Sequence, residues 1–141
     1  MGPPRILCVL LVGLLLSPNL RGLAQDKNTE AAQRAVEVWL GLVDSGKYAE
    51  SYRAAAAIFQ AAVSEEKWVG AVQAARGPLG KLMTRSLKSA RYTKTLPGAP
   101  DGEYVVLTFE TSLEHKDAAV ETLTARLEKD GVWRVAGYFI R

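Results

Sequence analysis

The sequence has 141 residues, of which 48% are hydrophobic and 23% are charged, and its mean hydropathy is close to zero. This balance predicts a folded chain of one domain rather than a disordered one. The chain contains one cysteine and one histidine, which excludes a disulfide framework and a thiolate zinc site because each needs several sulfur atoms. The formal charge of +3 raises the question of nucleic-acid binding.

The first 24 residues have the composition of a secretory signal peptide. Arg5 and the N-terminal amine form a positive region, residues 6–16 are apolar apart from Gly13, and the small residues Gly22 and Ala24 precede a possible cleavage site. As a helix, the apolar run spans only about 16 Å, which favours a cleaved leader over a membrane anchor. We therefore predict a signal peptide, 1–24, and a single α+β domain, 25–141, in a protein that is periplasmic or secreted.

Cleavage changes the charge of the chain. The leader carries Arg5, Arg21 and no acidic residue, so the remaining 117 residues have a formal charge of +1 and no cysteine. Binding of nucleic acid depends on a concentrated basic excess. Lys88, Tyr92 and Lys94 form only a fragment of the alternating basic and aromatic pattern of single-strand binding, so we expect no nucleic-acid partner.

Apolar residues at helical spacing predict three helices before residue 80. The first follows N-cap candidates at 26–29 and ends at Gly46, and its predicted apolar stripe consists of Ala31, Ala35, Val38, Trp39, Leu42 and Val43. The second is predicted from Lys47 to Val63, where the alanines 54–57 combine high helix propensity with room for close packing. The third begins after Ser64 and ends at Gly77-Pro78.

After Gly80 the pattern becomes alternating. Thr84 to Thr95 is a weak strand candidate, and residues 97–102 form a turn-rich loop. Three further strands are predicted from the alternating residues Val105, Leu107, Phe109 and Leu113, then Leu123, Ala125 and Leu127, and, after an Asp130-Gly131 turn, Trp133, Val135 and Phe139. Three helices followed by four antiparallel strands predict an α+β fold with the helices packed on one face of a curved sheet.

Three segments carry a resemblance to a known family: residues 63–68 (VSEEKW), residues 76–80 (RGPLG) with Arg85, and residues 130–141 (DGVWRVAGYFIR). They resemble a family of small exported bacterial proteins, the domain of unknown function numbered four-zero-one-nine, over about Ala31 to Arg141. That family brings no established activity with it. The order of elements also resembles, more loosely, the nuclear transport factor two-like or cystatin-like cone, which implies a pocket between the helices and the concave sheet face.

Two acidic residues lie in the middle of predicted strands. By alternation Glu110 faces outward, whereas Glu121 has the parity of Leu123 and Leu127 and faces inward. A buried carboxylate needs a partner, and the candidates are Arg85, Arg76 and Arg134. Glu121 is a base or polar anchor in a ligand pocket, a member of a structural ion pair, or a residue at a frayed strand start in solvent. The candidate site residues are Glu121, Arg85, Arg76, Tyr138 and Trp68.

The sequence offers no complete metal or cofactor site. His115 lies between Glu114 and Asp117 at a predicted hairpin tip, but metal sites need three or four convergent ligands and there is no second histidine. The glycines fit no phosphate-binding spacing. We therefore assign no catalytic residue, metal or cofactor from the sequence.

We expect a non-enzymatic exported domain that binds a small apolar molecule or a partner protein. One alternative is a lyase or isomerase that uses Glu121 as base with a tyrosine donor. Another is a structural envelope factor whose partner pairs with an exposed sheet edge. An open cavity at Glu121 would favour the enzyme, a closed core with Glu121 tied to an arginine would oppose it, and a long unpaired final strand would favour edge pairing.

Overall fold

The structure is a computed structural model that describes residues 20–141, so residues 1–19 of the predicted leader lie outside the described residues. In chain order it contains the helices α1 (Leu20–Asp44), α2 (Tyr48–Arg53), α3 (Ala57–Ala62) and α4 (Glu65–Arg76), the 3₁₀ helix η1 (Gly77–Leu79), and the strands β1 (Leu82–Thr93), β2 (Tyr104–Leu113), β3 (Lys116–Leu127) and β4 (Trp133–Ile140). This order confirms the predicted α+β class.

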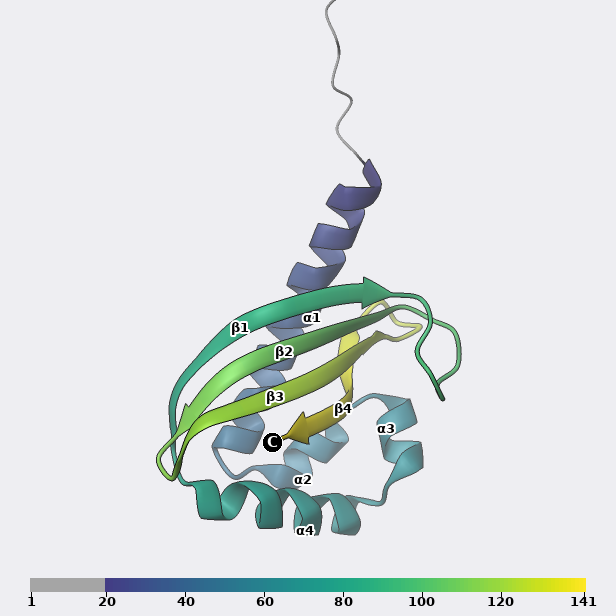
Figure 1. Cartoon of the computed structure of the whole chain (residues 1–141). Helices are drawn as coiled ribbons and strands as arrows, with labels where there is room; N and C mark the ends of the chain where they lie inside the picture. The colour runs from purple at the N-terminus through teal and green to yellow at the C-terminus, as the bar shows by residue number, and fades with distance from the viewer. Residues whose placement is uncertain (1–19) are drawn as a thin grey trace, which may run out of the picture.

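The four strands form one open antiparallel sheet in the order β1-β2-β3-β4, in which every strand pairs with its neighbours in the chain. The sheet arches around α1, which contacts all four strands (Figure 1). α2, α3 and α4 complete the helical layer on the same side. The strands therefore present one face to the helices, as predicted.

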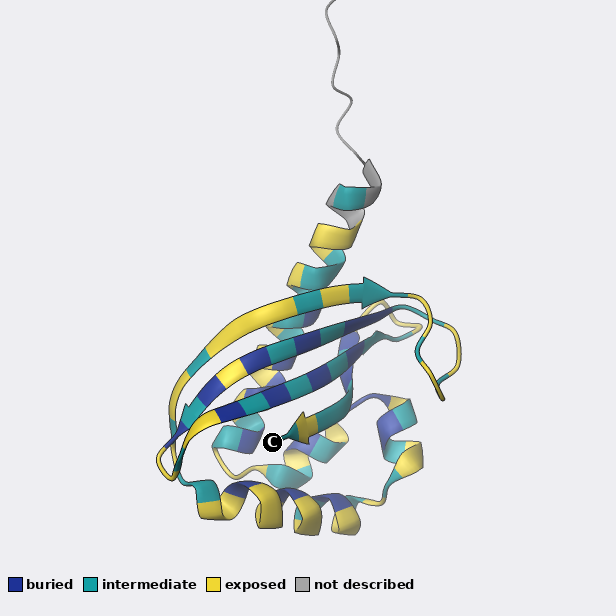
Figure 2. Ribbon diagram, viewed as in Figure 1, coloured by how far each residue is buried: buried dark blue, intermediate teal, exposed yellow. Residues whose placement is uncertain are grey.

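The core lies between the helices and the concave face of the sheet. Buried and less buried residues alternate along β2 and β3 (Figure 2), because successive side chains of a strand point to opposite faces. The inward residues Leu107, Phe109 and Leu123 are at most 1% exposed, and they pack with the buried Trp39 and Trp68 of the helices.

The second predicted helix is wrong in one respect, because residues 47–63 form two short helices, α2 and α3. The break falls in the alanine run, where Ala55 and Ala56 are 3% and 0% exposed. Ala56 has an extended backbone and its N–H donates to the carbonyl of Val135 in β4 at 2.8 Å. The small side chains allow this close contact, and the hydrogen bond to the sheet outweighs local helix propensity.

α1 differs from the prediction in its start and in its buried face. It begins at Leu20, before the predicted caps, and its most deeply buried residues are Ala32, Val36, Leu40 and Val43. Val38 of the predicted stripe is 74% exposed. Beside this buried stripe α1 therefore carries a second apolar stripe, Ala35, Val38 and Leu42, in which Ala35 and Leu42 are partly buried and Val38 is exposed. Among the described helices, none combines the length and the apolar character needed to cross a membrane.

β1 (Leu82–Thr93) replaces the predicted strand at 84–95, and a bulge explains its irregular pattern. The register shifts between Leu87 and Ser89, so that Leu87, Ala90 and Tyr92 all pair with inward residues of β2. One extra residue at a bulge reverses the alternation of a strand. The parity of the sequence alone therefore places these three residues on different faces.

Candidate functional site

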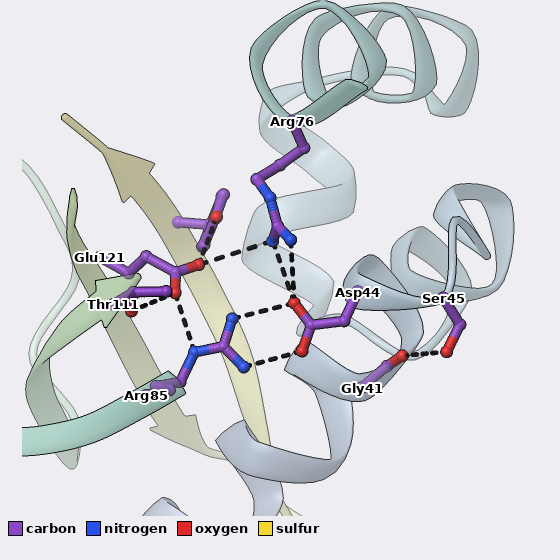
Figure 3. Close-up of polar contacts among 8 residues, drawn as sticks. Gly41, Asp44, Ser45, Arg76, Arg85, Thr111 and Glu121 are labelled. Atoms are coloured by element: carbon purple, nitrogen blue, oxygen red, sulfur yellow. Dashed lines mark hydrogen bonds and ion pairs between the residues drawn. The ribbon is translucent and has the colours of Figure 1, made fainter. Parts of the chain in front are cut away.

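Glu121 lies in the middle of β3 and is completely buried, in agreement with its parity. Its Oε1 accepts hydrogen bonds from Nε of Arg85 at 2.8 Å and from Oγ1 of Thr111 at 2.7 Å. Its Oε2 accepts a hydrogen bond from the hydroxyl of Tyr138 at 2.5 Å and lies 3.7 Å from Nη1 of Arg76. Both carboxylate oxygens are thus occupied by protein groups (Figure 3).

Asp44, the last residue of α1, is a second carboxylate in the same cluster. Its Oδ1 accepts hydrogen bonds from both terminal nitrogens of Arg76 at 3.1 Å and from Nη2 of Arg85 at 2.9 Å, and its Oδ2 accepts from Nη1 of Arg85 at 2.7 Å. We define the ionic cluster as the four charged residues Asp44, Arg76, Arg85 and Glu121 together with Thr111 and Tyr138. It connects α1, α4 and all four strands.

The charges of the ionic cluster balance, with two guanidinium groups and two carboxylates. The side chains of Arg76 and Arg85 are 3% and 11% exposed, and that of Asp44 is 15% exposed. Burial lowers the pKa of Arg85, but its hydrogen bonds to Asp44 and the charge of Glu121 outweigh this and raise it. Burial and the neighbouring Glu121 charge raise the pKa of the Tyr138 phenol. Both groups therefore stay protonated at neutral pH, each as a hydrogen-bond donor.

This geometry is that of a structural ion network. A general base must reach a proton of the substrate, whereas Glu121 has no exposed surface and accepts hydrogen bonds at both oxygens. Nε of Arg76 is a buried nitrogen without a hydrogen-bond partner among the described residues. That atom has no contact with solvent either, so it does not open the cluster to a ligand.

The structure brings together four of the five candidate residues, namely Glu121, Arg85, Arg76 and Tyr138. The ring of Trp68 is in edge contact with that of Tyr138, with 6.2 Å between ring centroids, and its indole donates to Oγ of Ser51 at 3.0 Å. Trp68 is therefore a core residue and not a member of the cluster.

Arg134, the third candidate partner of Glu121, pairs with another residue. Its Nη1 and Nη2 bind Asp130 at 3.0 and 2.8 Å in the β3–β4 hairpin. Glu110 is exposed and pairs with Lys88 at 3.4 Å, and His115 is exposed at the tip of the β2–β3 hairpin. In the part of the chain that the structure describes, no group of three His, Cys, Asp or Glu residues is placed to hold a metal ion.

Sequence reasoning missed Asp44 and Thr111, although one signal pointed to Asp44. A carboxylate at the C-terminal end of a helix is unfavourable next to the negative end of the helix dipole. Such a residue needs a nearby cation, and here Arg76 and Arg85 supply two.

Described side chains fill the space between the helices and the sheet where the looser resemblance implies a pocket. That space holds packed aromatic rings, with Phe59 and Trp68 in edge contact at 4.9 Å and Trp39 at 5.6 Å from Tyr138. A surface cavity with a mostly apolar lining lies instead between α1, the end of α2 and the start of β4.

This cavity, the α1–β4 groove, has a volume of about 550 Å³. Its floor is apolar and includes the second stripe of α1, and its charged lining residues are all arginines. The lining residues are Arg34, Ala35, Val38, Trp39, Leu42, Arg53, Ala54, Val132, Trp133, Arg134 and Val135. Val38 and Val132 are 74% and 47% exposed. The groove was not predicted, because the sequence pattern assigned Val38 to the core.

Most of this fold matches a known protein family. A family model described as "Protein of unknown function (DUF4019)" matches residues 35–138. The chain belongs to that family. The match includes the complete ionic cluster and all of the α1–β4 groove except Arg34. None of the curated proteins matches the chain, and the looser likeness to the nuclear transport factor two-like cone is not confirmed. Family membership supplies no activity.

Proposed function

We propose that the protein is an exported, non-enzymatic binding domain that holds a small apolar molecule in the α1–β4 groove. The observation that carries the proposal is the exposure of Val38, 74%, at the centre of the second apolar stripe of α1. An isolated exposed valine needs no explanation. Here it adjoins Ala35, Leu42 and Val132 in one concave surface, which is the form of a ligand site.

The size of the groove fits a small molecule. Its volume of about 550 Å³ lies within the range of about 300–1,000 Å³ that is typical of small-molecule sites. Burial of apolar ligand surface contributes about 25 cal/mol per Å² before the costs of association. The groove therefore offers a hydrophobic driving force without any catalytic group.

The walls of the groove are held in place by the core. The indole of Trp39 donates to the carbonyl of Ser51 at 2.8 Å, and the ring of Trp39 packs against that of Trp68 at a tilt of 38°, with 5.9 Å between ring centroids. On the opposite wall, the backbone of Val135 accepts the hydrogen bond from Ala56. The ionic cluster fastens the C-terminal end of α1 to β1 and β3. A preformed site of this kind loses little conformational entropy on binding.

Export is part of the proposal and rests on the sequence of residues 1–24. Their positive start, short apolar run and small residues at a cleavage site are typical of a secretory leader. The cysteine-free composition of residues 25–141 suits an oxidising compartment, because no free thiol is exposed to oxidation there. We propose a periplasmic or secreted location on these grounds.

The two alternatives have weaker support. A lyase or isomerase with Glu121 as base would require the substrate to reach its carboxylate, and Glu121 has no exposed surface. Pairing of a partner with the sheet edge would use β1 or β4. β1 is interrupted by a bulge and carries Lys88 there, features that discourage edge pairing. The outer side of β4 already accepts the N–H of Ala56 at Val135.

Two measurements test the binding function. Native mass spectrometry of the protein purified from its own host after export is expected to show a co-purified small molecule. Purified protein is expected to shift and enhance the fluorescence of the neutral apolar dye Nile red.

A pair of variants locates the site. Val38→Ser is expected to weaken dye binding several-fold, whereas Gln33→Ser, on another side of α1, leaves it unchanged. A protein that carries no small molecule and leaves the dye unaffected would refute the proposal, as would equal binding by the two variants.

A further inference from the structure

We infer that the ligand of the α1–β4 groove is an amphiphilic anion, with an alkyl chain on the groove floor and a carboxylate or similar head group bound by arginine. This inference rests on the proposed function and adds the chemical class of the ligand. The juxtaposition that carries it is an apolar floor whose charged lining residues are Arg34, Arg53 and Arg134, with no acidic residue among those that line the groove.

Arg34 is the cation with the most freedom to bind an anion. It is exposed on α1, and its side chain forms no ion pair or hydrogen bond with another described residue. It lies one turn before Val38. Residues at this spacing lie on the same side of a helix. A head group at Arg34 therefore leaves the attached chain to run over Val38 and Leu42.

Arg53 and Arg134 pair with acidic residues but keep unused donors. Arg53 binds Glu65 through Nε and Nη2, and Arg134 binds Asp130 through Nη1 and Nη2. A guanidinium has five N–H donors in a planar fork, so each of these arginines retains others for a second acceptor. Both residues line the groove, where they add donors near the apolar floor.

Trp133 supplies a neutral donor at the same place. It is 7% exposed, it lines the groove, and its indole nitrogen donates to no described residue. This nitrogen is not one of the buried unpaired atoms of the described residues, so it is accessible from the surface, and an indole N–H at such a place can donate to a ligand. An oxygen of the head group would satisfy this donor, and the indole resonance then gives a site-specific signal in NMR spectra.

The decisive experiment compares decanoate with 1-decanol, each titrated into the purified protein below its aggregation concentration at pH 7.5. The two probes share an alkyl chain and differ in the charged head group. We expect decanoate to bind about tenfold more tightly, as charge-assisted hydrogen bonds to arginine imply. We also expect it to move the indole cross-peak of Trp133 further than 1-decanol does.

Two variants test whether Arg34 causes the preference for decanoate over 1-decanol. Arg34→Gln is expected to remove the preference for decanoate and to leave the binding of 1-decanol unchanged. Arg91→Gln, which removes an exposed arginine from β1, is the matched control and is expected to bind like the parent protein.

The outcomes separate this inference from the proposed function. Equal affinity for the two probes, or an unchanged preference in Arg34→Gln, would overturn the anionic head group and leave apolar binding intact. Failure of both probes to bind would overturn the proposed function as well. If an acidic amphipathic peptide of leucine and glutamate moved the Trp133 resonance and decanoate did not, the groove would be a protein-binding site and the small-ligand inference would be wrong.

Discussion

Arg85 on the edge strand β1 donates from Nη1 and Nη2 to both carboxylate oxygens of Asp44, at 2.7 and 2.9 Å, while its Nε binds Glu121 at 2.8 Å. A planar guanidinium can bind two carboxylates in this way, whereas a lysine cannot. One side chain thereby links the end of α1 to β1 and β3. The position of α1, and with it one wall of the groove, depends on this residue.

We expect strong energetic coupling between Asp44 and Arg85. In a double-mutant cycle with Asp44→Asn and Arg85→Gln, the interaction energy should be about 1–3 kcal/mol, because the two side chains share one buried network. The exposed pair of Arg53 and Glu65, whose side chains are 67% and 40% exposed, is the control and should give less than about 1 kcal/mol. Urea unfolding of each set of variants measures both values, and equal coupling in the two pairs would contradict the role assigned to the cluster.

Replacement of Glu121 by glutamine should destabilise the fold by about 3–5 kcal/mol, because it leaves two buried guanidinium groups with a single carboxylate. Glu110→Gln changes the same side chain on the outer face of β2, where the side chain is 62% exposed, and should alter stability by less than about 0.5 kcal/mol. Thermal and urea unfolding at neutral pH provide the comparison. Coincident melting curves for Glu121→Gln and the parent protein would show that the network is not structural.

Unfolding at alkaline pH should reveal how much the Tyr138 phenol contributes to the stability of the fold. The folded protein holds the pKa of this phenol above its unfolded value of about 10, through burial and the charge of Glu121. The unfolded chain therefore loses its proton first, so this stabilisation is complete below about pH 10 and declines above it, with a slope approaching about 1.4 kcal/mol per pH unit for one group. Urea unfolding between pH 8 and 11 should show a smaller decline for Tyr138→Phe than for the parent, and equal slopes would contradict this.

The sequence predicts the buried position of Glu121 but not its full set of partners. Alternation along β3 is regular, so parity places Glu121 inward. The need of a buried carboxylate for a cation points to Arg85, Arg76 and Arg134, of which the structure places the first two beside Glu121. Asp44 was missed because a pattern in sequence does not show that a helix end lies beside a distant strand. The bulge at Leu87–Ser89 is likewise set by pairing with β2, which no local pattern in β1 encodes.

The break in the alanine run likewise could not be predicted from local sequence, because tertiary packing outweighs helix propensity there. Because Ala56 is completely buried against β4, Ala56→Leu should destabilise the protein by about 1–3 kcal/mol through overpacking. Ala57→Leu, at the adjacent exposed position, should change stability by less than about 0.5 kcal/mol. If urea unfolding gave the same stability for both variants, it would contradict the close packing of residues 55–56 against β4.

Gly80 should be the least tolerant of the glycines with positive φ. It has φ 75° and ψ −156°, a region essentially restricted to glycine, and an added Cβ would lie 2.9 Å from Cβ of Glu114. Leu79 and Lys81 on either side accept hydrogen bonds from the β2–β3 hairpin.

Gly80→Ala should therefore cost about 2–4 kcal/mol, from backbone strain and steric overlap together. Gly98 has φ 77° and no atom within 4 Å of an added Cβ, so Gly98→Ala should cost only about 1–2 kcal/mol. Hydrogen exchange gives a local readout, because the amides of Glu114 and His115 donate to Lys81 and Leu79. These two amides should exchange faster in Gly80→Ala than in Gly98→Ala, and equal exchange would show that the hairpin does not depend on the close approach at Gly80.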